Sequence, residues 1–389
     1  MTATPTLARN PTSTADVVDR VRDASARCQS LRIVGGGSWL DANRPVRAFE
    51  TLVIRDLAGI VEYEPGDLTL TARAGTTLDE IMRATAPHGQ WLTLDPPGDS
   101  ARATIGATIA TASYGPLAHH FGTPRDMTLG VEFVTGAGDI VRGGGRVVKN
   151  VAGFDLTRLV TGSWGTLGVL TEATLRLRAL PAVETTVAID VGGGNEVERA
   201  WEALHALPFT PLAAQLLDAT LARALGVAER GPVLLVRLGG NEEAVRAQRE
   251  QLRTIGDMQA IDGEPWRALR VAEPSRAVVL RMSRRPSLFA ASWVDAARVI
   301  ERWPSGYGHG DPGRGVVRVV LPFAGEVSEA MARAALDVPF DGTRIFERLP
   351  AELWDRLAPS ASRNRLDRDI KATFDPTSVL NPGILGTTQ

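Results

Sequence analysis

The sequence predicts an α+β protein of two domains, and three observations support this class. The 389 residues are enough for two or three domains with substantial cores. Before residue 180, short strands are separated by glycine-rich turns, whereas strands and helices alternate regularly after it. Such alternation predicts helices packed on one face of an antiparallel sheet. We therefore expect a first domain over residues 1–180, a second that covers it over residues 181–350, and a tail over residues 351–389 that returns to the first.

The first part is expected to begin with a helix over residues 14–29, because Ser13 and Asp16 are spaced as in a capping box. Pro65-Gly66 predicts a type II turn between two strands, and Thr77 with Glu80 opens a second helix that ends near residue 86. The other expected elements are strands at 31–34, 51–54, 60–64, 68–74, 91–94 and 171–177, a short helix at 103–110, and a hairpin of 129–134 with 140–142.

The second part shows strand and helix patterns in alternation. Strands are expected at 183–191, 212–217, 233–238, 277–281 and 316–321, and helices at 195–206, 242–254, 288–302 and 327–335. The tail is expected to form one helix over residues 351–373, followed by an irregular end.

Composition excludes several classes of protein. The formal net charge is −2, so there is no electrostatic case for binding nucleic acid or an anionic membrane. The single cysteine, Cys28, excludes an internal disulfide and a four-cysteine zinc or iron–sulfur site held by this chain alone. No run of 18 apolar residues occurs, and the first 30 residues lack the apolar segment of a signal peptide. We expect a cytoplasmic protein without a transmembrane segment, either free or held at the inner membrane through partners.

Glycine is concentrated in three segments. Residues 142–170 contain seven glycines, and smaller groups lie at 35–37, directly after a strand, and within 96–107. Ordered glycine usually marks a positive φ or a close approach of the backbone, and successive main-chain N–H groups can bind phosphate oxygens. A plain series of turns explains residues 142–170 equally well when they are taken alone. Recurrence in three segments favours a ligand gripped by the main chain.

The common nucleotide-binding motifs do not fit the turn at 35–39. Both G-x-G-x-x-G and G-x-S-x-G would need glycine at position 40, which is Leu40. The Walker A pattern is absent as well. A pyrophosphate-binding turn of another kind remains.

Three separated sequences carry a resemblance to a known family. They are Gly-Gly-Gly-Ser-Trp at 35–39, the Pro-Pro-Gly to Thr-Ile-Gly-Ala segment at 96–107, and Lys-Asn-Val-Ala-Gly-Phe-Asp-Leu with Gly-Thr-Leu-Gly-Val-Leu-Thr-Glu within 149–172. In this order they resemble the FAD-binding domain of the vanillyl-alcohol oxidase and p-cresol methylhydroxylase (PCMH-type) flavoproteins. Phe-Asp-Pro and Leu-Asn-Pro-Gly within 374–383 are similar to that family's C-terminus. Within the family, the sequence from Lys149 and the length are most similar to the FAD-binding E subunits of glycolate oxidases.

The resemblance implies an FAD cofactor, an antiparallel cap domain, and a set of cofactor-binding residues. The implied set is Gly35, Gly36, Gly37, Ser38 and Trp39 in the pyrophosphate turn; Pro97, Gly98, Thr104, Ile105, Gly106 and Ala107 on the ribityl and flavin side; Gly115, Gly122, Arg125 and Asp126 in loops near the flavin; and Gly165, Thr166, Gly168 and Val169 beside the adenine or pyrophosphate. Asn150, Gly153 and Asp155 are expected to brace the last of these segments. Main-chain donors at close range would let a nearly neutral protein bind the two phosphates without a lysine cluster.

Two departures from the family pattern bear on chemistry. Trp39 stands in the turn where flavin-linked members carry a histidine or cysteine, which predicts non-covalent FAD. The metal motif His-x-Gly-Asp-Gly-Asn-x-His of members that oxidise D-2-hydroxy acids is degenerate at residues 308–315 and lacks its second histidine. With five histidines in the chain, a metal site is not expected, and no catalytic residue is assigned.

Four individual residues keep two interpretations each. His119 and His120 are either polar loop residues or flavin contacts, and His309 is either a vestige of the metal motif or a catalytic group. Lys149 either contacts a phosphate or serves a structural role.

Three functions remain open. The first is an FAD-binding redox subunit of a glycolate-oxidase-type complex, which relays electrons between a larger flavin subunit and an iron–sulfur subunit. The second is a free-standing FAD-dependent dehydrogenase or oxidase of a small 2-hydroxy acid or lactone, with Arg276, Arg281 or Arg314 binding the substrate's carboxylate. The third is a scaffold that FAD stabilises without redox turnover.

Overall fold

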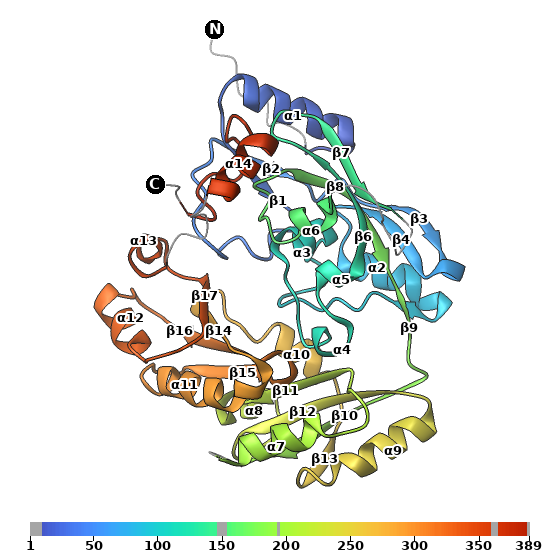
Figure 1. Cartoon of the computed structure of the whole chain (residues 1–389), viewed down its shortest axis with the longest axis vertical. Helices are drawn as coiled ribbons and strands as arrows, with labels where there is room; N and C mark the ends of the chain where they lie inside the picture. Colours follow the sequence, from blue (N-terminus) through green and yellow to red (C-terminus); the bar gives the residue numbers. More distant parts are fainter. Residues whose placement is uncertain (1–9, 146–153, 193–194, 359–364, 387–389) are drawn as a thin grey trace.

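Two antiparallel sheets organise the chain, and each has its own helices and core. The structure is a computed structural model that describes residues 10–145, 154–192, 195–358 and 365–386. Figure 1 shows the five-stranded sheet at one end of the molecule and the eight-stranded sheet at the other. Lys149, Asn150 and Gly153 lie outside the described residues, so their expected roles stay predictions.

The first part forms a five-stranded sheet of order β3-β4-β8-β6-β7, beside which β1 and β2 pair in parallel. Its elements are α1 (Thr14–Ala26), β1 (Leu31–Val34), β2 (Glu50–Val53), β3 (Ile60–Glu64), β4 (Thr69–Arg73), α2 (Leu78–Thr85), β5 (Gln90–Trp91), α3 (Ile105–Thr111), α4 (Ala118–Phe121), α5 (Pro124–Met127), β6 (Thr128–Val134), β7 (Ile140–Gly144), α6 (Leu156–Val160), β8 (Val169–Arg176) and β9 (Arg178–Ala179). The capping boxes expected at Ser13 and Thr77 are both present. The core of this part also contains Val379 and Leu380.

The second part forms an eight-stranded sheet of order β13-β10-β12-β11-β15-β16-β14-β17, in which every neighbouring pair is antiparallel. Its elements are β10 (Val183–Asp190), α7 (Asn195–His205), β11 (Ala213–Leu217), α8 (Ala219–Ala224), β12 (Val233–Gly240), α9 (Glu242–Leu252), β13 (Met258–Ile261), α10 (Pro265–Arg270), β14 (Ala277–Ser283), α11 (Phe289–Glu301), β15 (Tyr307–Asp311), β16 (Val316–Pro322), α12 (Glu329–Leu336) and β17 (Thr343–Arg348). The expected α+β class with an antiparallel second sheet is confirmed.

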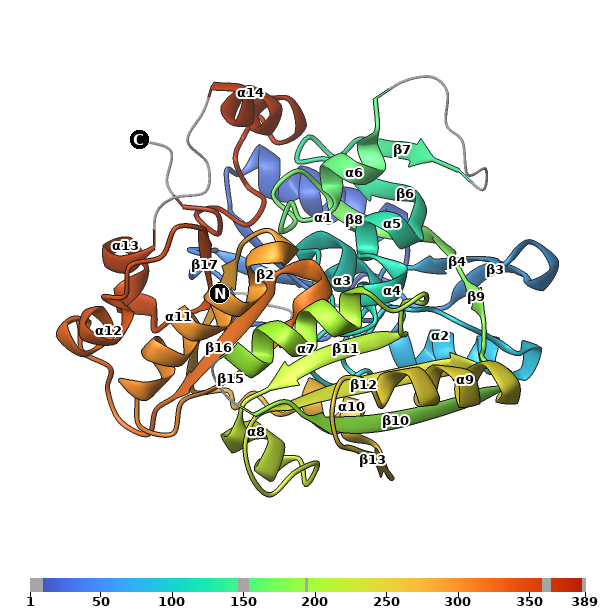
Figure 2. The same ribbon diagram turned by 60° about the horizontal axis from the view of Figure 1, so that its bottom comes forward.

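The two faces of the eight-stranded sheet differ because alternate residues of a strand point to opposite sides. One face packs against α7, α9, α11 and α12, and Figure 2 shows α7 and α9 in front of the sheet. The other face packs against α8 and α10 at one end and turns toward the first part at the other. This second face carries the polar residues described below.

Two expectations about local structure are wrong. The tail does not form one helix over residues 351–373, because α13 (Trp354–Leu357) ends at an extended Ala358 and α14 (Arg365–Phe374) is separate. Ala358 precedes a proline in the sequence, and the residue before proline is pushed out of the helical region. Residues 65–67 form a 3₁₀ turn, in which the left-handed position (φ 55°) falls on Leu68 rather than on Gly66.

Glycine in the turn at 35–37 allows it to touch the segment that leads into α3. A Cβ atom on Gly36 would lie 1.7 Å from the carbonyl oxygen of Arg102, and one on Gly35 would lie 2.3 Å from Thr104 Oγ1. Gly106 in turn packs against Ala74 of the neighbouring strand end, where a Cβ would meet Ala74 Cβ at 2.6 Å. These glycines therefore let three segments of the first part contact one another directly.

We predict that Gly36→Ala lowers the free energy of unfolding by about 1 to 3 kcal/mol, because the added methyl forces the 35–37 turn and Arg102 apart. Gly66→Ala is the matched control, since its Cβ would meet no atom within 4 Å and its φ is not positive. Its effect should stay near zero or be slightly stabilising. Urea denaturation of both variants measures the free energy of unfolding, and equal changes in the two variants would contradict the packing argument.

Candidate functional site

Three segments that are far apart in sequence meet around a small cavity of about 110 Å³. From the segments that sequence analysis singled out, its wall takes Gly35, Gly37, Ser38 and Trp39, then Thr104, Gly106 and Ala107, and finally Gly165 and Gly168. Gly37 and Ser38 line this cavity, and their main-chain N–H groups donate to no acceptor in the part of the chain that the structure describes. Unpaired main-chain donors beside a cavity are suited to phosphate oxygens, so these residues fit the pyrophosphate of a dinucleotide.

A larger cavity of about 610 Å³ lies between the two parts of the chain and adjoins the small one. Trp39, Thr111 and Trp164 line both cavities. The Trp39 indole donates to the carbonyl of Pro97 at 3.2 Å and lies 6.5 Å from the ring of Trp164. An extended ligand could therefore place one end among the glycine turns and the other beneath the eight-stranded sheet.

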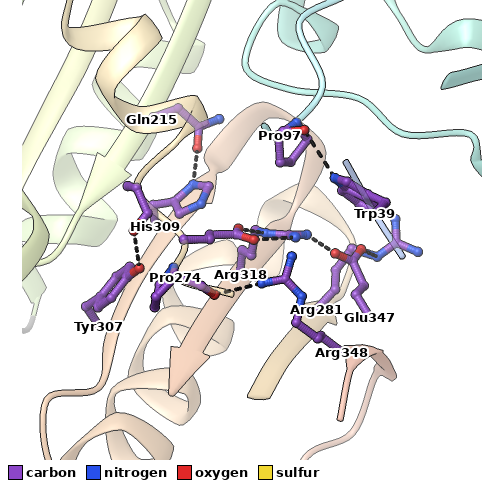
Figure 3. Close-up of polar contacts among 12 residues, drawn as sticks. Trp39, Pro97, Gln215, Pro274, Arg281, Tyr307, His309, Arg318, Glu347 and Arg348 are labelled. Atoms are coloured by element: carbon purple, nitrogen blue, oxygen red, sulfur yellow. Dashed lines mark hydrogen bonds and ion pairs between the residues drawn. The ribbon is translucent and has the colours of Figure 1, made fainter. Parts of the chain in front are cut away.

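The eight-stranded sheet forms the wall of the larger cavity that faces the first part, and this wall carries polar side chains from several strands. Arg318 on β16 forms ion pairs with Glu273 and Glu347, and its guanidinium lies 5.9 Å from the ring of Trp39 (Figure 3). Burial alone would raise the pKa of Glu273, but the guanidinium of Arg318 outweighs it and holds that pKa below the usual range. Arg281 on β14 lies 3.4 Å from Glu347 and donates to the hydroxyl of Tyr114 at 3.2 Å. Glu273 is thus held ionised beside Arg318, and Glu347 pairs with both Arg318 and Arg281.

His309 lies next to this network on β15, and its Nδ1 is 3.0 Å from Gln215 Oε1 (Figure 3). Because an amide oxygen only accepts, His309 Nδ1 carries the proton and Nε2 keeps its lone pair. Burial lowers the pKa of His309 to about 4, so the ring is neutral at pH 7. A neutral imidazole in a cavity wall can accept a proton.

Asp95 is a second unusual titratable group in the larger cavity. Burial raises its pKa to about 7, although the neighbouring Arg270 opposes this. Both of its carboxylate oxygens lie 3.2 Å from the N–H of Leu117. Arg270 belongs to α10 and ties it to the first part, since its Nε donates to Pro96 O at 3.0 Å and its carbonyl accepts from Gly98 N at 2.7 Å.

The remaining residues predicted from the sequence divide into two groups. Pro97, Gly115 and Arg125 line the larger cavity. Seven further predicted residues lie in the wall of neither cavity, and their contacts with the cofactor stay predictions: Gly36, Gly98, Ile105, Gly122, Asp126, Thr166 and Val169.

Each of these seven has another structural use. Ile105 and Val169 are fully buried in the core of the first part. The carboxylate of Asp126 accepts from Thr123 N and Oγ1 and packs against Gly122, and the hydroxyl of Thr166 donates to Ser163 O at 2.7 Å. Gly36 packs on Arg102, and the N–H of Gly98 is taken by Arg270.

The histidines and arginines named from the sequence are now placed as well. His119 Nδ1 lies 2.8 Å from Asp311 Oδ1 with both side chains buried, and His120 Nδ1 lies 3.1 Å from Thr210 O, so both contact the second part of the chain. Arg281 lines the larger cavity, whereas Arg314 packs on Tyr114 beside it. Arg276 is exposed and donates to Gly325 O, away from either cavity.

Sequence analysis missed Gln215, Glu273, Arg318 and Glu347, as well as Asp95. A signal for two of them was present, because Arg318 and Gln215 are single polar residues inside the apolar strands 316–321 and 213–217. A lone polar group at the centre of an apolar strand indicates a polar face where the sheet is covered by another layer.

Comparison with known proteins agrees with this arrangement. Residues 5–144 match a family model described as an FAD binding domain. The chain is 34% identical to glycolate oxidase subunit GlcE of Escherichia coli over 255 residues, which are 65% of this chain and 67% of that subunit. It is 29% identical to glycolate oxidase subunit GlcD of Bacillus subtilis over 264 residues, spanning 66% of this chain and 55% of that protein. A solved structure of p-cresol methylhydroxylase with substrate bound superimposes with a TM-score of 0.73 at 16% identity, covering 97% of this chain and 88% of that one.

An antiparallel cap over a glycine-lined cavity, together with these matches, defines the class as a flavoprotein. The chain belongs to the PCMH-type FAD-binding flavoproteins, the family that includes the glycolate oxidase subunits, and it is an FAD-dependent oxidoreductase. Within the described ranges, no helix is long and apolar enough to cross a membrane. In those same ranges, no three His, Cys, Asp or Glu side chains are grouped so that they could hold a metal ion.

We predict that Arg318→Met destabilises the fold by about 3 to 5 kcal/mol, because it leaves the buried carboxylates of Glu273 and Glu347 without their shared cation. Arg276→Met removes an exposed arginine with one hydrogen bond and should change stability by less than about 1 kcal/mol. Denaturation midpoints of the two variants give the comparison. If Arg318→Met lowers stability no more than Arg276→Met does, the two glutamates do not depend on the Arg318 guanidinium.

We also predict that Asp95→Asn stabilises the protein more at pH 9 than at pH 5. The folded chain, with an Asp95 pKa of about 7, binds more protons than the unfolded chain between about pH 4 and 7, so wild-type stability falls as pH rises through that window. The asparagine variant does not lose stability in this way. The difference in free energy of unfolding between the variant and the wild type should therefore grow by on the order of 2 to 4 kcal/mol from pH 5 to pH 9. Urea denaturation at both pH values measures the gap, with Asp56→Asn, at an exposed carboxylate, as the control. A gap that is the same at both pH values would contradict the burial of an ionisable Asp95.

Proposed function

We propose that this chain is the FAD-binding redox subunit of a glycolate-oxidase-type 2-hydroxy acid dehydrogenase complex. The observation that carries the proposal is that three glycine-bearing segments line one cavity, which adjoins a larger cavity under the second sheet. The identity to a named glycolate oxidase subunit supports the same assignment. The proposed partners are a larger flavin subunit and an iron–sulfur subunit, with a small 2-hydroxy acid as the substrate of the complex. The proposed location is the cytoplasm, or the inner membrane surface through those partners.

The proposed cofactor site uses the residues that line the two cavities. The unpaired N–H groups of Gly37 and Ser38 would hold the pyrophosphate, and Gly165 and Gly168 would lie beside it from the other side. The flavin would extend past Trp39 toward Pro97 and the cap wall. FAD supplies the redox chemistry, since it accepts two electrons and passes them on. Attachment is proposed to be non-covalent because the turn carries Trp39 rather than histidine or cysteine.

The cap wall supports a relay role for this subunit. Arg318 is already paired with Glu273 and Glu347, so it has no free positive charge for a substrate carboxylate. The same network fixes the side chains of the cap wall next to Trp39. A fixed wall of this kind would hold a flavin in one position and keep water away from it.

A free-standing dehydrogenase is the second candidate, and His309 favours it. A neutral imidazole with a lone pair on Nε2 lines the larger cavity, and Arg281 lies in the same wall. In that case His309 would take the hydroxyl proton of a small 2-hydroxy acid while Arg281 orients its carboxylate.

One experiment separates the two candidates. The purified chain, supplied with FAD, should be yellow, and acid precipitation should release the flavin into the supernatant. With glycolate or D-lactate and a dye acceptor, the relay role predicts turnover near background for the chain alone and turnover after co-purification with the partner subunits. Robust turnover by the chain alone that His309→Gln abolishes, and that the exposed-site control His88→Gln keeps, would overturn the relay role. A colourless protein would overturn both candidates.

A further inference from the structure

A segment near the end of the chain, residues 371–384, returns to the first part and inserts beside β1. Leu380 pairs with Leu31 in parallel, Leu31 N donates to Val379 O at 2.7 Å, and Asn381 N donates to Leu31 O at 2.9 Å. Val379 and Leu380 are fully buried in the core of the first part. Figure 1 shows α14, which leads into this segment, beside α1 and β2 rather than with the eight-stranded sheet.

The side-chain amide of Asn381 bridges two of the segments that line the small cavity. Its Oδ1 accepts from Ile33 N at 2.8 Å, two residues before Gly35, and its Nδ2 donates to Trp164 O at 2.7 Å, one residue before Gly165. The two partners fix the orientation of the amide, because one supplies a donor and the other an acceptor. Asn381 is 4% exposed and lines the small cavity itself.

Backbone geometry at this contact is unusual for the residue types involved. Trp164 has a φ of 55° and Asn381 a φ of 44°, both in the left-handed region. Asparagine tolerates this region, but a bulky residue such as tryptophan adopts it only when its surroundings hold it there. The contacts that hold Trp164 are the Asn381 amide on its carbonyl and the carbonyl of Ala110, which accepts from its N–H at 2.8 Å.

A second contact from the same segment holds the next residues of the turn. The ammonium of Lys371 donates to Thr166 O at 2.7 Å and to Leu380 O at 3.2 Å, and it pairs with the buried Asp375. Asp375 accepts from Val379 N at 3.0 Å and Leu380 N at 2.9 Å. The 371–384 segment therefore contacts both Trp164 and Thr166 of the 164–166 turn. It also contacts Leu31 and Ile33 of β1.

We propose that Asn381 is a positioning residue for FAD binding: its amide sets the distance between the strand that leads into Gly35 and the turn that leads into Gly165. This inference rests on the proposed cofactor site. Ile33 and Trp164 belong to segments more than 100 residues apart in sequence, and among the described residues no main-chain hydrogen bond joins them directly. Loss of the amide should let the two walls of the small cavity move apart without unfolding either part of the chain.

The test compares full-length variants after removal of flavin, by titrating FAD and following quenching of its fluorescence. For Asn381→Ala the dissociation constant should rise at least about tenfold, because two buried hydrogen bonds are lost. Thr377→Ala is the control on the same segment, since its exposed hydroxyl contacts Ser25 Oγ, away from the small cavity, and the affinity of this variant should equal that of the wild type. Melting of each flavin-free variant is recorded in parallel.

Two outcomes would overturn the inference. If Asn381→Ala is folded and binds FAD like the wild type, or if it melts at a lower temperature while its folded fraction binds with unchanged affinity, the residue is only structural. Should the alanine variant fail to fold, Asn381→Gly removes the same amide and tolerates the φ of 44°, and the same tenfold criterion applies to it. A wild-type chain that binds no FAD would overturn the proposed function itself, which is distinguishable from failure at Asn381.

Discussion

The contact between the 35–37 turn and the segment that leads into α3 is the constraint on which the rest of the structure depends. A single Cβ at Gly36 would lie 1.7 Å from the carbonyl oxygen of Arg102, so only glycine permits this approach. Because the two segments touch, the turn lies beside Thr104 and Gly106, and Gly37 and Ser38, whose N–H groups are unpaired among the described residues, line the small cavity. The glycines were expected to let the backbone reach a phosphate. In the structure they also bring protein segments into contact, and the small cavity lies beside that contact.

The second part of the chain is attached to this site through buried polar contacts rather than through a continuous apolar core. Arg270 holds the 96–98 turn, and His119 meets Asp311 across the boundary. The three large apolar clusters each belong to one part, and a small cluster of Trp91, Leu117 and Leu212 crosses the boundary. The polar groups that line the larger cavity therefore find partners across the gap. A buried carboxylate or guanidinium left alone is unfavourable by several kcal/mol, which explains why Arg318 lies between two glutamates.

Much of the fold could be predicted from the sequence because local rules govern it. Capping pairs such as Ser13 with Asp16 and apolar alternation in strands such as 316–321 are local signals, and the elements they predict are present. The strand β15 was missed because Tyr-Gly-His-Gly-Asp looks like a turn, and only pairing with β11 and β16 makes it a strand. The glycine segments could be named, but not the side chains that join them. Asn381 and Lys371 lie more than 200 residues from the turn they contact, and no local pattern predicts such a contact.

The central claim is that the glycine-bearing segments form one binding site for the pyrophosphate of FAD. The most direct measurement is a crystal structure of the full chain with FAD bound. We expect density for the two phosphates in the small cavity, against the main-chain N–H groups of Gly37 and Ser38, with the flavin extending past Trp39 into the larger cavity. FAD bound elsewhere on the molecule, with those N–H groups facing solvent, would contradict the account.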